Sequence, residues 1–193
     1  MRTIQTMYTW IAYESNAFDG MDEQYINALG GNDSGRFVPC WGKSSNKLIF
    51  ELCEEYEENP YYVVPKRTKN SFLTDPATYT LDGKSVTTVT FAEPIIIDSE
   101  FLGVAGIDIS LEQLTLINSN VKLFENGFGK LVNSNGIVLA HPGEYKLDKV
   151  DAELEGESGL KQLEKIKIGE VKRDLGFSED LGQDAYKFYM LCS

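Results

Sequence analysis

The stretch Phe101–Ser110 (FLGVAGIDIS) constrains the fold of this chain more than any other segment. Side chains of a β-strand alternate between two faces, so one face is small and apolar and carries Gly103, Ala105, Ile107 and Ile109. The other face carries Asp108 near the end of an otherwise apolar strand. A buried carboxylate is costly unless a cation or hydrogen-bond donors meet it. The stretch therefore predicts a core strand that presents one binding carboxylate.

Two hairpins lead into this strand. Thr78–Leu81 and Ser85–Phe91 flank an Asp-Gly pair, which is a strong signal for a hairpin turn. A second hairpin joins Ser85–Phe91 to the stretch above. If its turn is centred on Ser99, Thr90 lies opposite Asp108. One face of the two strands then carries Thr88, Thr90, Gly106 and Asp108.

A helix follows directly. Ser110 is a good N-cap, and Gln113 three residues later completes the pattern of a capping box. Apolar residues continue at near-helical spacing, namely Leu111, Leu114, Ile117, Val121 and Phe124. We expect an exit helix over 110–124 that packs one stripe against a core.

The earlier part of the chain predicts further short elements. Met7–Tyr13 is typical of a first strand, and Met21–Leu29 of a short helix. Arg36–Trp41 and Lys47–Leu52 predict another hairpin. Asn59–Lys66 (NPYYVVPK) has two prolines, which favour a structured loop or a single helical turn.

The second half predicts a smaller unit. Gly129–Asn133 and Gly136–Ala140 are expected to be short strands around a type I′ turn. Asp148–Glu170 is charged and expected to be helical in parts, with buried candidates Leu154, Leu160, Leu163 and Ile166. Asp184–Cys192 alternates like a strand and ends the chain, so this unit is expected to be incomplete or small.

Charge and hydropathy exclude several classes of protein. The 193 residues carry a formal net charge of −12, which argues against a binder of nucleic-acid backbones. No run approaches the roughly 18 apolar residues of a membrane span. The first residues also lack the apolar centre of a signal peptide. We therefore expect either a cytosolic protein or a piece of a longer one.

The cysteines are expected to be free thiols. Cys40, Cys53 and Cys192 match no metal-binding spacing. A hairpin that turns near Ser44–Ser45 sets Cys40 opposite about position 49. Cys53 then lies about four residues away, roughly 13 Å along the strand, which is too far for a disulfide.

Catalytic and cofactor motifs are missing from the sequence. His141 is the one histidine, which excludes a histidine-pair metal site, and we expect it to be structural. The sequence contains no phosphate-binding or dinucleotide-binding glycine motif. We therefore expect no catalytic residues, no metal and no cofactor.

A set of aromatics and one strand carboxylate remains, comprising Trp41, Tyr56, Tyr61, Tyr62, Thr90 and Asp108. A carboxylate with aromatic walls can bind an ammonium group through charge-assisted hydrogen bonds and cation–π contacts. The alternative is that the tyrosines pack the sheet and Asp108 bonds backbone amides. The residues alone leave both interpretations open.

Several segments resemble double Cache domains. PIIIDSEFLGVAGIDISLEQL with its preceding hairpin, GRFVPCW, YYVVPKRT and LVNSNGIVLAHP are similar to segments of that family. The resemblance implies an α+β fold of two PAS-like modules, each an antiparallel sheet flanked by helices. It also implies a ligand amine on Asp108, with Tyr62 and Tyr61 at matching pocket positions. We expect a membrane-distal ligand-binding module over 1–122 and a partial membrane-proximal module over 123–193.

The chain departs from this family at informative positions. Asn59 stands where the amino-acid-binding members have an arginine for the ligand carboxylate, and Ala77 stands where a pocket tyrosine is common. The family's long N-terminal helix and its two membrane spans are missing. A sensory region excised from a longer receptor is the favoured interpretation, and a soluble relative that lost its anchor is the alternative.

The expected function is ligand sensing. The resemblance implies an extracytoplasmic domain of a membrane-anchored chemotaxis receptor or histidine kinase, with no catalysis of its own and no nucleic-acid partner. The expected ligand is a small amine or another polar or cationic metabolite, and a homodimer is among the expected assemblies. Two alternatives stay open: a carboxylate-based hydrolase, and a ligand-free structural or dimerisation module.

Overall fold

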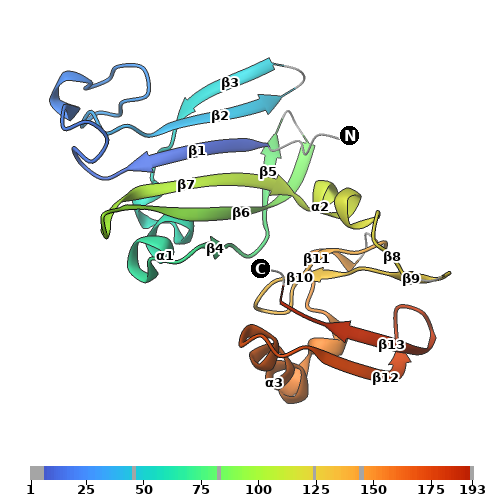
Figure 1. The fold of residues 1–193 in the computed structure, drawn as a ribbon. Coiled ribbons are helices and arrows are strands. Elements are labelled where there is room, and N and C mark those ends of the chain that lie inside the picture. The colour runs from blue at the N-terminus through green and yellow to red at the C-terminus, as the bar shows by residue number, and fades with distance from the viewer. Residues whose placement is uncertain (1–6, 45–46, 82–83, 124, 144–145, 192–193) are drawn as a thin grey trace. The chain divides into compact units, whose positions relative to one another are not determined.

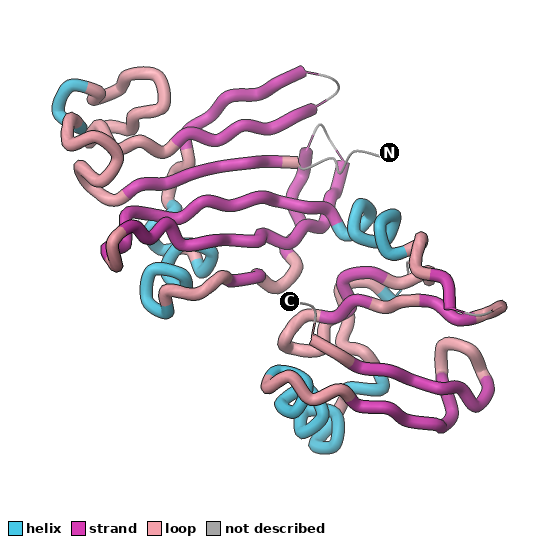
Figure 2. The backbone as a smooth tube through the Cα atoms, in the orientation of Figure 1, coloured by secondary structure: helices cyan, strands magenta, loops and turns pink. Residues whose placement is uncertain are grey.

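A computed structural model describes residues 7–44, 47–81, 84–123, 125–143 and 146–191. The chain divides into two compact units, Met1–Ile117 and Asn118–Ser193 (Figure 1). The assignment of these units as membrane-distal and membrane-proximal modules stays a prediction. The fold class is confirmed, because antiparallel sheets and flanking helices make up the chain (Figure 2).

The first unit is built on one antiparallel sheet in the order β3-β2-β1-β7-β6-β4, with β5 also paired to β6. Its strands are β1 (Tyr8–Tyr13), β2 (Pro39–Ser44), β3 (Lys47–Leu52), β4 (Phe72–Leu73), β5 (Ala77–Leu81), β6 (Lys84–Ile97) and β7 (Glu100–Ser110). All the expected strands of this unit are therefore present. The turn at 82–83 lies outside the described residues.

The register at the centre of the sheet agrees with the sequence-based expectation. Asp98 and Ser99 take positive φ angles at the turn between β6 and β7, and Thr90 lies opposite Asp108. β1 occupies the other side of β7 and sets Tyr8 opposite Asp108. Asp108 is thus flanked by a side chain from each neighbouring strand.

The core lies on one face of this sheet, beneath α1 (Pro60–Thr68). Buried side chains from β1, β6 and β7 meet Tyr62 of α1 and Tyr56 of the short helix η2 (Tyr56–Glu58). The main cluster comprises Trp10, Ala12, Val38, Tyr56, Tyr62, Ala92 and Val104. The small residues at positions 12 and 92 leave room for the two tyrosine rings.

Two local expectations before β4 are wrong. Met21–Leu29 forms only the short helix η1 (Asp22–Gln24), where buried Asp22 accepts hydrogen bonds from the loop at Ser15 and Asn16. Asn59–Lys66 was expected to be a loop or single turn, but it forms most of α1. Pro60 opens this helix where no N–H is needed, and Pro65 is accommodated in its interior.

The exit helix is shorter than expected. α2 spans Leu111–Asn118, and the Ser110 hydroxyl accepts the Gln113 N–H at 3.2 Å, which confirms the N-cap. The helix does not continue to position 124, because Val121 N–H bonds back to Asn118 and the chain then enters β8 (Lys122–Leu123). Phe124 lies outside the described residues.

Within its described residues, the second unit contains three two-stranded sheets and one longer helix. Its strands are β8, β9 (Gly127–Phe128), β10 (Leu131–Val132), β11 (Val138–Ala140), β12 (Lys172–Ser178) and β13 (Gln183–Tyr189). Its fully described helices are η4 (Ala152–Leu154) and α3 (Gly156–Lys167). The expected strands and partial helix of this region are present, although the strands are shorter than the apolar runs.

Two details of the second unit differ from expectation. Only Gly136 has a positive φ in the turn between β10 and β11, whereas a type I′ turn needs two such residues in succession, so the turn is not type I′. The ladder of these strands is irregular between Leu131 and Val132. Leu160 is exposed, whereas Leu154 and Leu163 are buried as expected. α3 turns Leu160 to water because its buried stripe runs through Gly159 and Leu163.

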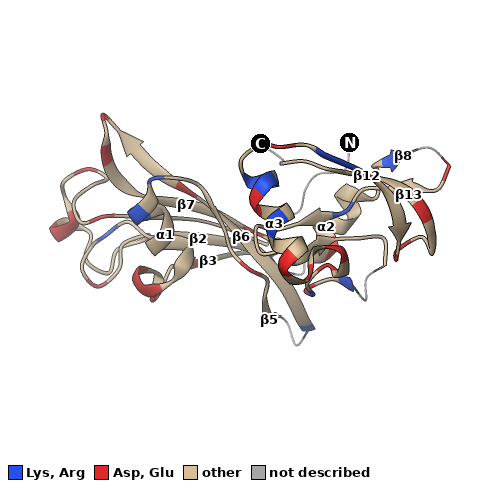
Figure 3. Ribbon diagram, turned by 90° about the horizontal axis from the view of Figure 1, so that it is seen from below, with Lys and Arg blue, Asp and Glu red and all other residues tan. Residues whose placement is uncertain are grey.

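A buried group of charges supports the second unit. Lys130 pairs with Asp151 and Asp180, and Lys146 also pairs with Asp180. His141 is buried beside them, with its Nδ1 accepting the Gly143 N–H at 2.8 Å. The structural role expected of His141 stays a prediction. Elsewhere acidic and basic residues are interspersed in both units (Figure 3).

Candidate functional site

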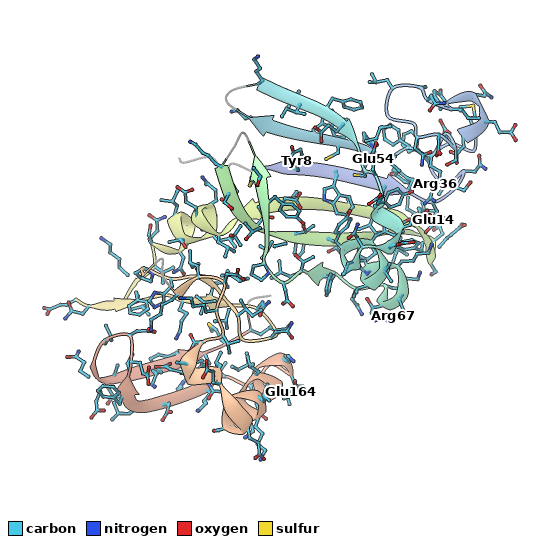
Figure 4. The ribbon with its side chains drawn as sticks, turned by 180° about the vertical axis from the view of Figure 1, so that it is seen from behind. Tyr8, Glu14, Arg36, Glu54, Arg67 and Glu164 are labelled. Carbon is cyan, nitrogen blue, oxygen red and sulfur yellow. The ribbon has the colours of Figure 1, made fainter. Side chains whose placement is uncertain are left out.

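A cavity of about 360 Å³ opens on the same sheet face as the core of the first unit. It lies beside Tyr61 of α1 and is bordered by residues of β1, β5, β6 and β7. Its lining comprises Met7, Tyr8, Trp10, Cys40, Cys53, Glu54, Tyr61, Tyr79, Thr80, Thr88, Thr90 and Asp108. Tyr8 and Glu54, which border it, are labelled in Figure 4. The volume falls within the range of small-molecule sites.

Asp108 supplies a half-buried charge to this cavity. Its Oδ1 accepts the Thr90 hydroxyl at 2.6 Å, and its carboxylate also accepts a hydrogen bond from the Trp10 indole. Burial raises the pKa of Asp108, and these two hydrogen bonds offset only part of that effect. The two hydrogen bonds therefore replace only part of the solvation that the carboxylate has lost, so a cation beside it is favoured.

Aromatic rings form the wall beside Asp108. Trp10 of β1 and Tyr61 of α1 are in contact, with ring centroids 5.0 Å apart. The Trp10 ring lies over Gly106, where an added Cβ would come within 2.2 Å of the indole. Burial raises the pKa of Tyr61 to about 12, so it stays a neutral phenol at physiological pH.

The cavity is acidic. Asp108 and the exposed Glu54 both line it, and the described lining residues include no lysine, arginine or histidine. The arrangement can therefore bind a small cation by charge and aromatic contact. Among the described residues, no group of three or more His, Cys, Asp or Glu side chains is arranged to hold a metal ion.

Three of the six predicted site residues come together here. Asp108, Thr90 and Tyr61 line the cavity. Trp41 does not line it, because it lies on β2 opposite Phe50 and Thr9, on the other sheet face from Cys40. Its ring packs against Phe50 at 5.7 Å.

Tyr56 and Tyr62 lie in the core and not among the lining residues. Their rings pack edge to face, with centroids 4.8 Å apart. The Tyr62 hydroxyl donates to Glu14 at 2.8 Å. These two tyrosines therefore position α1, and with it Tyr61.

Sequence reasoning missed Tyr8, Trp10 and Tyr79 as lining residues. Tyr8 and Trp10 share a face of β1, and both lie against glycines: Gly42 beside the Tyr8 ring and Gly106 beneath Trp10. A strand with large aromatics at alternate positions, paired with strands that carry glycines, was the available signal.

Asn59 and Ala77 are not among the described lining residues. The Asn59 amide donates to the Glu55 carbonyl at 2.8 Å and so is engaged next to the start of α1. Ala77 pairs with Thr88 on β6. Neither position supplies a cation that could bind a ligand carboxylate.

Comparison with known families identifies the kind of domain that carries this cavity. Residues 2–116 match the family model described as methyl-accepting chemotaxis protein-like, first PDC sensor domain. The chain belongs to this family. The match covers most of the first unit, including every strand of its sheet.

Two curated relatives are chemotaxis receptors. The methyl-accepting chemotaxis protein TlpQ of Pseudomonas aeruginosa is 28% identical over 166 residues, which cover 77% of this chain and 22% of the relative. The methyl-accepting chemotaxis protein PscA of Pseudomonas syringae pv. tomato is 32% identical over 82 residues, covering 42% and 13% respectively. The chain thus spans less than a quarter of the length of either relative.

Solved structures extend the likeness over both units. The extracellular domain of the putative histidine kinase mmHK1S-Z3 is 32% identical, with a TM-score of 0.72, covering 96% of this chain and 68% of that one. A structure titled methyl-accepting chemotaxis protein X is 25% identical, with a TM-score of 0.66, covering 97% and 69%. This chain is an extracytoplasmic sensor domain of the chemoreceptor and sensor-kinase type, as the Cache resemblance implied.

Proposed function

We propose that this sensor domain binds a small organic amine in the cavity of the first unit, with the ammonium group on Asp108. The observation that carries the proposal is the carboxylate of Asp108, which is half-buried and bonded to two neutral donors, Thr90 and Trp10. An ammonium would replace lost solvation with a charge-assisted hydrogen bond. The faces of Trp10 and Tyr61 would add cation–π contact.

An amine without an α-carboxylate fits this cavity better than an amino acid does. A ligand carboxylate would enter an acidic cavity that also holds Glu54. It would find no cationic side chain among the described lining residues, and Asn59 replaces the arginine that the Cache resemblance would supply. Like charges brought together in a partly buried site are costly.

Calorimetric titration tests the proposal. We expect butylamine, putrescine and choline to include at least one binder, and alanine and glutamate to bind at least about tenfold more weakly. Asp108→Asn should abolish binding while preserving the circular dichroism spectrum. Glu93→Gln is the matched control, because it removes one carboxylate from the same sheet outside the cavity lining.

The outcomes separate the alternatives. Tight binding of a plain amino acid with no response to any amine would contradict the proposal. If Glu54→Gln lost binding while Asp108→Asn bound fully, the ammonium group of the ligand would be assigned to Glu54 and not to Asp108. If Asp108→Asn unfolds the domain, Asp108 is a structural residue.

The whole protein is proposed to be a membrane-anchored receptor whose sensor has no catalysis of its own. The receptor and sensor-kinase relatives support this, and among the described residues the hydrogen-bond donors to half-buried Asp108 are the neutral side chains of Thr90 and Trp10. In the described residues, no helix is long and apolar enough to cross a membrane. Turnover of chromogenic esters or glycosides that disappears in Asp108→Asn would favour the hydrolase. Homodimerisation stays a prediction, which light scattering on the purified protein can test.

A binding signal is proposed to leave the cavity along β7. Asp108 lies two residues before Ser110, the N-cap of α2, and the segment 54–76 that carries Tyr61 borders the cavity. Ligand would close that segment over the sheet and shift the start of α2. Such a shift is limited to the ligand's differential affinity for the two states, typically about 1–3 kcal/mol.

A further inference from the structure

Two cysteines share the cavity wall. Cys40 of β2 and Cys53, one residue after β3, both line the cavity and are free thiols. Cys40 lies opposite Glu51, and the Cys53 N–H continues the ladder by bonding the Val38 carbonyl at 2.8 Å. The expected register, which set Cys40 opposite position 49, is therefore wrong by two residues.

This register makes the two cysteines diagonal neighbours on one face. Diagonal neighbours of an antiparallel pair have Cα atoms about 7–8 Å apart, with the Cβ atoms somewhat closer. A disulfide needs a Cα separation of at most about 6.8 Å. A bridge therefore requires an approach of about 1 Å, and Cys53 lies at the ladder's end, where the chain leaves the sheet.

The thiols already interact. A hydrogen bond between them lowers the pKa of Cys40, whereas the same bond and burial raise the pKa of Cys53. The pair thus has one thiol suited to form a thiolate and one suited to stay protonated until the first has reacted. Sensor domains of this family face the extracytoplasmic space, where disulfides persist.

We propose that Cys40 and Cys53 are a redox-active pair that forms a disulfide across the cavity wall and thereby narrows the amine site. The oxidant is an organic disulfide. The Cys40 thiolate attacks one of its sulfurs, forming a mixed disulfide and releasing the first organic thiol. Cys53 then attacks the Cys40 sulfur and releases the second. Two protein thiols are oxidised, and one organic disulfide is reduced to two thiols.

The bridge would act on the cavity through the segment that follows Cys53. Glu54 lines the cavity, and the chain passes from it through η2 to α1, which supplies Tyr61. Drawing Cys53 toward β2 moves this segment toward Asp108 and fixes it there. This consequence rests on the proposed amine site, whereas formation of the bridge does not.

The first experiment measures the bridge without any amine. Cys192→Ser removes the third cysteine. The purified variant is treated with oxidised glutathione and then with iodoacetamide, and its mass is measured by mass spectrometry. We expect the loss of two hydrogens, no bound glutathione and no alkylation. Cys53→Ser in the same background should retain one glutathione, since the second attack is lost. Alkylation of both thiols, or a stable glutathione adduct on Cys192→Ser, would overturn the proposal.

The second experiment compares amine affinity in the two redox forms. We expect the oxidised form to bind the best amine of the panel about fivefold more weakly, or by about 1 kcal/mol, with recovery after reduction. Cys40→Ser/Cys53→Ser should show no redox dependence. If the oxidised and reduced forms bound the amine equally well, the proposed narrowing of the amine site would be overturned. Failure of the reduced form to bind any amine would instead count against the proposed ligand.

Discussion

At the residue scale, Asp108 is held in an environment that suits binding better than stability. Its carboxylate is partly desolvated and is met by the Thr90 hydroxyl and the Trp10 indole, both neutral. Neutral donors recover less of the lost solvation than a cation does. An ammonium ligand can therefore bind this carboxylate favourably. The same desolvation also determines how ligand binding depends on pH.

Amine affinity should fall in mild acid. The folded-state pKa of Asp108 is raised by burial, so the carboxylate takes up a proton at a higher pH than an ordinary aspartate, while an alkylamine stays charged. Binding needs the ionised carboxylate and is lost as pH falls through that raised pKa. Calorimetry between about pH 4 and pH 8 measures this. Affinity that is constant over this range would contradict the role of Asp108.

Removing the half-buried charge of Asp108 should stabilise the empty domain. A carboxylate with a raised folded-state pKa costs stability above that pKa, and this cost disappears as pH falls below it. Asp108→Asn should therefore unfold at an equal or higher temperature than the wild type at neutral pH, by up to a few degrees. The gap should shrink in acid. A large drop in melting temperature at neutral pH would show that the carboxylate is structural.

Gly106→Ala tests the aromatic wall. An added Cβ would lie 2.2 Å from the Trp10 ring, so the indole must move away from β7. We expect a loss of about 1–3 kcal/mol in stability and at least about tenfold in amine affinity. Gly176→Ala in β12, where nothing lies within 4 Å of the added Cβ, is the control. Unchanged binding by Gly106→Ala would exclude Trp10 from the site.

At the element scale, the cavity depends on how α1 is fastened to the sheet. Arg36 donates twice to the Tyr13 carbonyl, at 3.0 and 2.9 Å, and pairs with Glu57 of η2. Glu14 follows β1 and is labelled with Arg36 in Figure 4. It accepts a hydrogen bond from Tyr62 and pairs with Lys66 of α1. This network joins β1, η2 and α1 and so positions Tyr61 over the cavity.

Arg36→Met should loosen this attachment. The change leaves the Tyr13 carbonyl without its two donors and removes the buried cation beside Glu14 and Glu57. Denaturant unfolding should show a loss of about 2–4 kcal/mol. Lys66→Met, which removes a half-exposed partner of Glu14, should cost no more than about 1 kcal/mol. Equal losses for the two variants would contradict the fastening role of Arg36.

The elements that the sequence predicted are those with strong local signals. The hairpins around Thr90 and Asp108 and the Ser110 cap needed only turn chemistry and alternation. α1 could not be predicted, because Pro65 in its interior opposes a helix and the packing of Tyr62 outweighs that proline. Trp10 joined the site only through pairing of β1 with β7, across about a hundred residues of chain, which no local pattern reports.

At the scale of the whole chain, two units with separate cores imply two separable unfolding events. The first unit buries Trp10 and Tyr62, and the second buries Leu139 and Leu154. Both tryptophans of the chain, Trp10 and Trp41, belong to the first unit. Tryptophan fluorescence therefore follows the first unit, while calorimetry follows both.

The stability of the second unit should fall in acid, because Asp180 becomes protonated. Burial raises the pKa of Asp180, but hydrogen bonds and charges from Lys146 and Lys130 outweigh burial and hold it at about 2. Its stabilising contribution is present above an unfolded-state pKa of about 3.9 and is lost as pH falls toward 2. Asp180→Asn should thus lower one calorimetric transition at neutral pH, and the gap to wild type should close in acid.

The same variant tests whether the units respond independently. Asp180→Asn should leave the midpoint of tryptophan fluorescence unchanged, because Trp10 and Trp41 lie in the first unit. An amine that binds the first unit should raise the midpoint of tryptophan fluorescence and leave the calorimetric transition of the second unit unchanged. If Asp180→Asn shifts the fluorescence midpoint as much as the calorimetric one, the two units unfold as one body, and ligand in the first unit then stabilises the second directly.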